Sequence, residues 1–514
     1  MFRGVLTVGG WTMASRVMGF VRDILIAALA GTGPVADAFF VALRVPNLFR
    51  RLFGEGAFNA AFVPEFSGIL ATEGPEPAKH FAEQAIAVLA FWLVLLTVAG
   101  EVFMPQLMLV LAPGFMDIPG KAELTVALAR ITFPYVLLIC LAALLSGVLN
   151  GLDRFAAAAA APLVFNTVSI AAMLLLTPHL PTVGHALSWG VTISGVLQLA
   201  LLAWAVRRAG MVLHIPRPRL TPQMRVLLAR MGPGLLGAGV TQLNLAVDVI
   251  IVSLLPPGSA SLLYYADRVN QLPLGVIGTA VGTALLPLLS RQARAGQARE
   301  AAETLNRALE VSLALTLPAA LALAVAGQPI MLVLFGRGAF GPVAAELSAQ
   351  ALAAYAIGLP AFVVVKVLVP AFFAHGDTST PVRVGFAAIG LNLVLNLLFM
   401  VPLRHMGPAL ATSVSALFNV IVLGVMLGRR GRLVIDRRLQ FRLARMAAAA
   451  LLMAVVLVLV QRFAFIRVEM KPGVRWAALA ALVGSGVAAY VAAGQLLGAF
   501  DLREMLRIMR RRRR

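Results

Sequence analysis

Long apolar runs recur along the whole chain and are separated by short segments rich in charge, glycine and proline. A bilayer crossing needs about twenty apolar residues, and by that measure about fourteen segments are long enough to cross. Their approximate ranges are 5–30, 34–66, 82–110, 124–150, 157–178, 185–206, 227–255, 262–289, 306–335, 345–374, 381–402, 408–428, 442–463 and 475–499. A β-barrel would instead show short segments of alternating hydrophobicity. The pattern predicts an all-α polytopic membrane protein.

Composition supports this class. Of the 514 residues, 60% are hydrophobic and only 13% are charged, which is not the composition of a soluble globular protein. The one cysteine, Cys140, excludes an internal disulfide and a cysteine-based metal cluster. Phosphate-binding GxxxxGK[ST] loops, HExxH and Cys/His metal spacings are missing from the sequence. We therefore expect a transporter rather than an enzyme, with no bound cofactor.

The net charge of +21 comes almost entirely from arginine. In a soluble protein it would indicate nucleic acid, but here most of it lies in short loops, as the positive-inside rule describes. With a cytoplasmic N-terminus, the arginine-rich loops after even-numbered spans and the tail RIMRRRRR are all cytoplasmic. The rule thus predicts that both termini are cytoplasmic. The last outer loop is the exception, with Arg462, Arg467, Lys471 and Arg475.

A short internal repeat indicates two halves. RVPNL at 44–48 is followed by AFVPEFS at 61–67, and RVNQL at 268–272 is followed by ALLPLLS at 284–290. The two copies lie in the second and eighth spans, so they run in the same direction across the membrane. This predicts two parallel six-span halves related by an axis along the membrane normal, although a chance match is the alternative.

The repeat and the charge distribution divide the chain into four parts. We expect an N-lobe over 1–207, a basic linker over 208–226, a C-lobe over 227–428 and a C-terminal helix pair with a polybasic tail over 429–514. The linker is either a plain cytoplasmic loop or contains a short helix lying on anionic lipid.

The second span carries a charged face. Asp37, Arg44, Arg51 and Glu55 are spaced so that they fall within a stripe of roughly 40° on a helix, with Asn47 at its edge. A charge at the bilayer centre costs roughly 2.5–3.5 kcal/mol even on lenient insertion scales. These side chains must therefore line a wet cavity inside the protein or pair with one another.

The first span adds three charges. Arg16 and Asp23 are seven residues apart and share a helical face, whereas Arg22 points about 120° away unless Gly19 bends the helix. Asp23 and Asp37 could neutralise arginines in inert ion pairs, which is the alternative to a cavity. Arginines outnumber acids in these spans, however, so some positive charge remains.

The other half contributes Arg268, whose neighbour Asp267 points about 100° away and is an imperfect local partner. Facing second and eighth spans would bring Arg268 to the same cavity. Because arginine binds planar oxyanions well, phosphate above all, such a cavity suits a large anion. A phosphorylated or pyrophosphorylated lipid is the natural membrane candidate.

Two further charged residues lie within predicted spans. Asp248 follows Asn244 by one turn in the seventh span, and a buried carboxylate there needs either a cation or an arginine as partner. Asp248 is therefore a candidate sodium or proton site. Lys366 in the tenth span either faces the cavity or snorkels to the membrane surface.

Six segments together resemble a known family. SRVMGFVRD, ADAFFVALRVPNLFRRLFGEGAFNAAFVP, APGF, ITFPY, YYADRVNQLPLGVIGTAVGTALLP and GDTSTPV are similar to those of the MurJ (MviN) lipid II flippases, members of the multidrug/oligosaccharidyl-lipid/polysaccharide exporter superfamily. The resemblance implies two six-helix lobes around a central V-shaped cavity, and two C-terminal helices forming a lipid-tail groove. It also implies the substrate, undecaprenyl-pyrophosphoryl disaccharide-pentapeptide, moved by alternating access from the inner to the outer leaflet of the bacterial inner membrane for peptidoglycan synthesis.

The resemblance also implies site residues. The cavity arginines of the family correspond to Arg16, Arg22, Arg50 and Arg268, and Asp37 and Glu55 lie in family motifs. Helical phase favours Arg51 over Arg50, but Pro46 can shift the phase after it, so we expect Arg50 to face the substrate.

Ion coupling and rival functions stay open. Some relatives hold sodium between the helices that correspond to those of Asp248 and GDTSTP, so coupling to Na⁺, H⁺ or the membrane potential remains possible. The alternative functions are a multidrug or cation antiporter, another polysaccharide-lipid flippase of the superfamily, or a non-transporting scaffold. We expect the protein to work as a monomer, either alone or with the cell-wall synthesis machinery.

Overall fold

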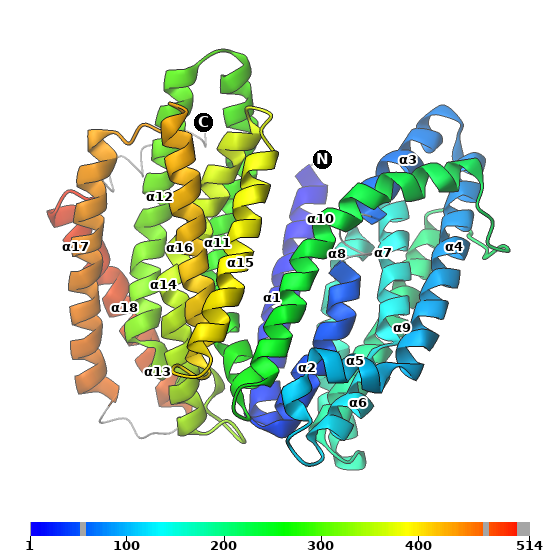
Figure 1. The fold of residues 1–514 in the computed structure, drawn as a ribbon, viewed down its shortest axis with the longest axis horizontal. Helices are drawn as coiled ribbons and strands as arrows, with labels where there is room; N and C mark the ends of the chain where they lie inside the picture. Colours follow the sequence, from blue (N-terminus) through cyan, green and yellow to red (C-terminus); the bar gives the residue numbers. More distant parts are fainter. Residues whose placement is uncertain (1, 52–57, 466–471, 501–514) are drawn as a thin grey trace. The chain divides into compact units, whose positions relative to one another are not determined.

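The computed structural model describes residues 2–51, 58–465 and 472–500, and these residues form helices joined by short turns (Figure 1). They divide into two compact units, 1–261 and 262–514. The helices that begin in the first unit are α1 (Phe2–Ala30), α2 (Pro34–Phe49), α3 (Phe58–Thr72), α4 (Pro75–Val102), α5 (Met104–Leu111), η2 (Pro113–Phe115), α6 (Lys121–Thr132), α7 (Tyr135–Gly151), α8 (Phe155–Leu176), η3 (Thr177–His179), α9 (Val183–Arg208), α10 (Pro222–Ser253) and α11 (Ser259–Arg294). Helix α11 continues into the second unit.

The second unit continues with a further set of helices. They are α12 (Ala298–Val325), α13 (Gly327–Phe335), α14 (Pro342–Phe373), α15 (Ser379–Phe399), α16 (Met406–Arg429), α17 (Arg437–Val460), η4 (Gln461–Phe465) and α18 (Pro472–Leu496). In this unit α14 packs between α12 and α16, while α17 packs on α12 and α18. The all-helical class predicted from the sequence is confirmed for the described chain.

Ten helical segments of the described chain are long and apolar enough to cross a membrane. They match ten of the fourteen predicted spans. The remaining four predicted spans correspond to α1, α2–α3, α10 and α11, which carry the charges singled out above. The multi-pass architecture is therefore established, and the full count of fourteen stays a prediction.

Several predicted spans are divided rather than continuous. The run 82–110 breaks at Phe103, the run 306–335 breaks at Ala326, and the run 124–150 breaks at Pro134. Pro134 has no N–H to donate to the helical ladder. At Phe103 and Ala326 the backbone leaves the helical region, with ψ of 13° and 16°. Apolarity continues through all three breaks, so a hydrophobicity pattern cannot locate them.

Helix boundaries repeat along the chain. Helices α4, α8 and α9 begin at residues 75, 155 and 183, while α12, α15 and α16 begin at 298, 379 and 406, which is 223 or 224 residues later. The short helices α5 and α13 both contain the sequence MLVL. The repeat noticed in the sequence thus extends over much of both halves.

Helix α10 belongs to one half of the chain by its position in the repeat and to the other half by the helices that it packs against. By position in the repeat, α10 corresponds to α1 and opens the second half. By contacts, it packs against α2, α3, α4 and α5 and belongs to the first unit, which ends at Ser261.

The linker before α10 has no helix over residues 211–221. It is held to α4, because the backbone N–H of His214 donates to Glu83 at 3.0 Å and that of Arg219 donates to Gln84 at 3.3 Å. The Thr221 hydroxyl then caps α10, accepting from the Met224 N–H at 3.2 Å. Residues 211–221 therefore form no separate surface helix, while the last residues of the predicted linker, 222–226, begin α10.

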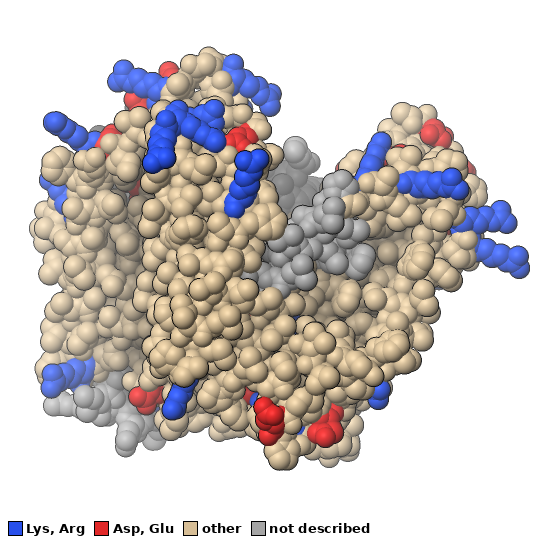
Figure 2. Space-filling view, in the orientation of Figure 1, with Lys and Arg blue, Asp and Glu red and all other residues tan. Residues whose placement is uncertain are grey.

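Aromatic packing and an ionic network hold the helices together within each unit. In the first unit, Phe62 of α3 stacks on Phe66 and on Phe81 of α4, with ring centroids 5.6 and 5.5 Å apart. In the second, Arg307 of α12 and Arg442 of α17 both donate to Glu310. Figure 2 shows lysine and arginine side chains gathered at the end of the second unit where α12 and α17 begin.

Candidate functional site

Asp37 of α2 is buried and accepts four hydrogen bonds. Its carboxylate accepts from the Lys121 ammonium at 2.9 Å, from the Gly258 N–H at 2.6 Å, and from the N–H and hydroxyl of Ser261 at 3.0 and 2.7 Å. These donors open α6 and α11, so Asp37 caps α11 from another helix, where the positive end of the helix dipole favours a negative charge. The carboxylate fastens α2, α6 and α11 to one another.

Lys121 was missed by the sequence analysis, which placed it in an outer loop. Its side chain is only 2% exposed, and its ammonium lies 3.8 Å from the centre of the Phe115 ring. Such burial is tolerated because the charge is paired with Asp37 and faces an aromatic ring. The sequence did contain a signal that Lys121 is unusual: nearly all basic residues of this chain are arginines, and Lys121 is one of only four lysines.

Arg22 and Asp23 of α1 pair with each other. Nε and Nη2 of Arg22 both donate to Oδ1 of Asp23, at 3.1 and 2.7 Å, although the two residues are adjacent. The Arg22 guanidinium also lies over the Phe165 ring of α8, 5.3 Å from its centre. The ion-pair alternative thus describes this pair, because a long arginine side chain can turn back around its helix.

Arg16 lies on the exposed side of α1. The neighbouring backbone is held to α8, because the Asn166 amide donates to the Ser15 carbonyl at 2.9 Å. Gly19 permits this approach, since a Cβ there would lie 3.3 Å from the Asn166 amide nitrogen. The structure therefore fixes the segment that carries Arg16 while leaving its side chain accessible.

The end of α2 brings Asn47 and Arg50 together. Nε of Arg50 donates to Oδ1 of Asn47 at 3.3 Å, and Arg50 is half-buried, whereas Arg51 is exposed. Residues 50 and 51 form a π-helical turn after Pro46, so a uniform α-helical phase does not hold there. Glu55, the last member of the predicted stripe, lies outside the described residues.

Asp248 of α10 lies within electrostatic range of Arg44 of α2. Both are half-buried, and the Arg44 guanidinium is the charge that acts on the Asp248 carboxylate. Of the two partners expected for Asp248, a cation or an arginine, the structure thus supplies an arginine. The described residues hold no group of three or more His, Cys, Asp or Glu side chains able to bind a metal, and sodium at Asp248 remains a prediction.

Arg268 and Lys366 lie in the second unit. Arg268 is half-buried in α11, and its guanidinium lies 5.9 Å from the centre of the Tyr264 ring. Its convergence with the arginines of the first unit stays a prediction. Lys366 of α14 is exposed, and a Cβ on Gly278 of α11 would lie 2.8 Å from its ammonium.

Asp377, in the GDTSTP segment, is fully engaged by its surroundings. It accepts from the Thr380 hydroxyl at 2.6 Å, from the Thr380 N–H at 2.9 Å, and from the Arg430 guanidinium. The Thr380 hydroxyl, followed by Arg430, holds the pKa of the Asp377 carboxyl well below its usual range. This carboxylate joins the α14–α15 turn to the end of α16.

Known proteins resemble the chain over nearly its full length. The family model described as "Lipid II flippase MurJ" matches residues 26–470. A "Probable lipid II flippase MurJ" of Rhizobium meliloti (strain 1021) is 43% identical over 511 residues, covering 98% of this chain and 95% of the relative. The "Lipid II flippase MurJ" of Burkholderia cenocepacia is 36% identical over 435 residues, covering 84% of each chain.

Solved structures share the fold. A "Lipid II flippase MurJ, inward closed conformation" superposes with a TM-score of 0.79 at 24% identity, covering 98% of this chain and 100% of the other. An inward-facing multidrug resistance MATE family transporter superposes with a TM-score of 0.68 at 12% identity, covering 83% of this chain and 99% of the other. Both likenesses concern the fold alone. The family model and the relatives above 30% identity show that this chain belongs to the MurJ family of lipid II flippases.

Proposed function

We propose that the chain carries the head group of lipid II from the inner to the outer leaflet of the bacterial cytoplasmic membrane by alternating access. Its fourteen spans form an N-lobe, a C-lobe and a C-terminal helix pair, with both termini in the cytoplasm. The undecaprenyl tail stays in lipid along α17 and α18 while the head group crosses through an arginine-lined cavity. Membership in the MurJ family supports the substrate, and the 223-residue repeat of helix boundaries supports the paired lobes.

The observation that carries this mechanism is the arginine surplus within α1, α2 and α11. By sequence these three helices contain more arginines than acids, and the carboxylate of Asp37 is held by Lys121 and the first turn of α11. We propose that Arg16, Arg22, Arg50 and Arg268 bind the pyrophosphate, since guanidinium groups bind phosphate oxygens in a bidentate manner. Arg44, Asn47 and Arg51 line the same path for the head group. Asp23 holds the side chain of Arg22, and Asp37 holds the first turn of the helix that carries Arg268.

The membrane potential can drive the anionic head group of lipid II outward. An inside-negative potential favours outward movement of an anion by about 2.3 kcal/mol per charge per 100 mV. Coupling to Na⁺ or H⁺ through Asp248 is a secondary proposal. Coupling of this kind would require Arg44 to leave Asp248 during the cycle.

A leaflet-resolved assay tests the proposal. Depletion of the protein in cells without another flippase should leave lipid II in the inner leaflet, and the wild-type chain should restore export. Each of Arg16→Ala, Arg22→Ala, Arg50→Ala and Arg268→Ala should fail to restore it at normal protein levels. Normal outer-leaflet lipid II after depletion would rule out the flippase, and drug sensitivity without a cell-wall defect would favour the multidrug antiporter.

A further inference from the structure

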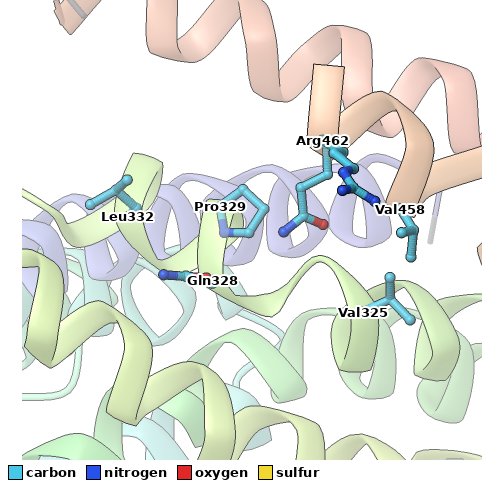
Figure 3. A pocket seen from close by; sticks show the side chains of 7 residues that line it. Val325, Gln328, Pro329, Leu332, Val458 and Arg462 are labelled. Carbon is cyan, nitrogen blue, oxygen red and sulfur yellow. The ribbon is translucent and has the colours of Figure 1, made fainter. Parts of the chain in front are cut away.

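A cavity of about 480 Å³ lies in the second unit, between the α12–α13 break and the end of α17. It is lined by Val325, Gln328, Pro329, Leu332, Val458, Gln461 and Arg462. Figure 3 shows Val325 and Val458 pointing toward one another, with Arg462 on the same wall as Val458 and Gln328 on the opposite wall. Each wall thus combines an apolar side chain with a polar one, Val458 with Arg462 on one wall and Val325 with Gln328 on the other.

The cavity lies near the ends of two candidate membrane spans. Its helices belong to candidate spans that end at Val325 and Phe463, so the lining residues sit at the ends of these spans. On α17, the apolar side chains of Val455 and Leu459 are 57% and 49% exposed. A molecule held here has its polar part in the cavity and its apolar part along α17.

The charge around the cavity is unusual for this end of the unit. The described residues of segments 311–345 and 447–500 contain three basic residues, Arg337, Arg462 and Arg475, while Glu346 lies near the start of α14. Among them, Arg475 donates to the Gly336 carbonyl at 3.4 Å, and Arg337 lies over the Trp476 ring. Arg462 has no acidic partner among the described residues. With the proposed orientation this end is periplasmic, where the positive-inside rule predicts few basic residues.

We propose that this cavity binds an anionic phospholipid of the outer leaflet, with its phosphate on Arg462 and the amides of Gln328 and Gln461. One acyl chain then lies against Val325, Leu332 and Val458. Arginine suits the phosphate because its planar guanidinium binds two oxygens at once. The cavity volume is that of a site for a drug-sized ligand, so it takes the head-group end and the first carbons of a chain. None of its lining residues is among the arginines assigned to the head group of the transported lipid, although it shares α17 with the proposed path of the undecaprenyl tail.

The test uses the purified full chain titrated with dioleoylphosphatidylglycerol, with the Kd of the tightest-bound lipid measured by native mass spectrometry. Arg462→Ala should weaken this Kd about tenfold, the size of one lost charge-assisted hydrogen bond. Val458→Trp, which fills the cavity, should weaken it similarly. Arg437→Ala is the matched control, because Arg437 is an exposed arginine at the other end of the same helix, and it should change the Kd less than about twofold.

Two comparison ligands identify the bound chemistry. Dioleoylglycerol, which lacks the phosphate, should bind weakly and equally to the parent and Arg462→Ala. Inorganic phosphate should bind far more weakly than the phospholipid. The proposal is overturned if Arg462→Ala and Arg437→Ala behave alike, if Val458→Trp has no effect, or if free phosphate binds as tightly as the lipid. Because no transport is measured, failure of the flippase mechanism would leave this result unchanged.

Discussion

The Lys121 ammonium lies 2.9 Å from Oδ2 of Asp37, and both side chains are almost completely buried. Breaking a buried pair by removing one partner typically costs about 3–5 kcal/mol, because the other charge is left uncompensated. Lys121→Met should therefore markedly lower the Tm of the purified protein. Lys79→Ala is the control, because Lys79 makes only a long contact of 3.8 Å to the exposed Glu76. Equal Tm values for the two variants would contradict the structural importance of the pair.

The two neighbouring arginines at the end of α2 should differ in function. Arg50→Ala should abolish complementation in a strain depleted of its own flippase, whereas Arg51→Ala should retain it. The reason is that Arg50 is half-buried and held by Asn47, while Arg51 is exposed. Growth is scored with protein levels checked by immunoblot. If Arg51→Ala abolished complementation and Arg50→Ala retained it, the uniform α-helical phase, which places Arg51 on the charged face, would be the better description of the end of α2.

Asn47 supplies a graded version of the same test. Asn47→Ala removes the acceptor 3.3 Å from Nε of Arg50 but leaves the charge in place. We expect partial loss of export, smaller than that of Arg50→Ala, because one hydrogen bond to a charged group contributes about 1.5–3 kcal/mol. Export is measured as accessible lipid II on the outer leaflet. Full activity would show that Arg50 is positioned by something other than Asn47.

Helices α14 and α16 touch at a glycine. A Cβ on Gly358 would lie 2.6 Å from Oγ and 2.7 Å from Cα of Ser413, whose hydroxyl donates to the Ala354 carbonyl at 2.7 Å. Gly358→Ala should destabilise by about 1–3 kcal/mol through overpacking. Gly390→Ala in α15 is the control, since nothing lies within 4 Å of its added methyl group and alanine favours a helix. Thermal unfolding should therefore shift in opposite directions.

The Asp377 carboxylate should give a pH-dependent contribution to stability. The Thr380 hydroxyl and Arg430 depress its pKa in the folded protein, while an unfolded aspartate titrates near ~3.9. Because the pKa of this carboxyl is lower in the folded than in the unfolded protein, its ionised form stabilises the folded state. That contribution is complete at pH values above the unfolded pKa, and it is lost as the pH falls toward the folded pKa. The Tm difference between the parent and Asp377→Asn should therefore stay constant from about pH 7 to pH 5 and shrink below about pH 4. A difference that already fades near pH 6 would contradict this assignment.

Much of the fold could be predicted from hydrophobicity, because a bilayer imposes long apolar runs. The breaks at Phe103 and Ala326 could not, since the residues on both sides are equally apolar. The repeated MLVL of α5 and α13 was a detectable signal for them that the sequence analysis passed over. Which helix of the first half corresponds to which helix of the second becomes clear only from the residues at which the helices begin.

The site was predicted in its residue types but not in its pairings. Helical phase correctly marked Asp37 as a residue that needs partners, yet Lys121 and Ser261 come from positions that the pattern assigned to loops or loop edges. Arg22 and Asp23 are adjacent, so phase places them apart, but the flexible arginine side chain closes the gap. The spacing of residues along a helix predicts the direction in which each side chain leaves the backbone, but not how far a long side chain bends back to a neighbour.

The cap that Asp37 places on α11 has a consequence for Arg268. The two lie on one uninterrupted helix, because α11 runs from Ser259 to Arg294, and Arg268 follows Ser261 by seven residues. At 1.5 Å per residue that is about 10 Å, close to two full turns. Loss of the Asp37 cap would leave the N–H and hydroxyl of Ser261 without this acceptor, and the first turn of the helix that carries Arg268 would be destabilised.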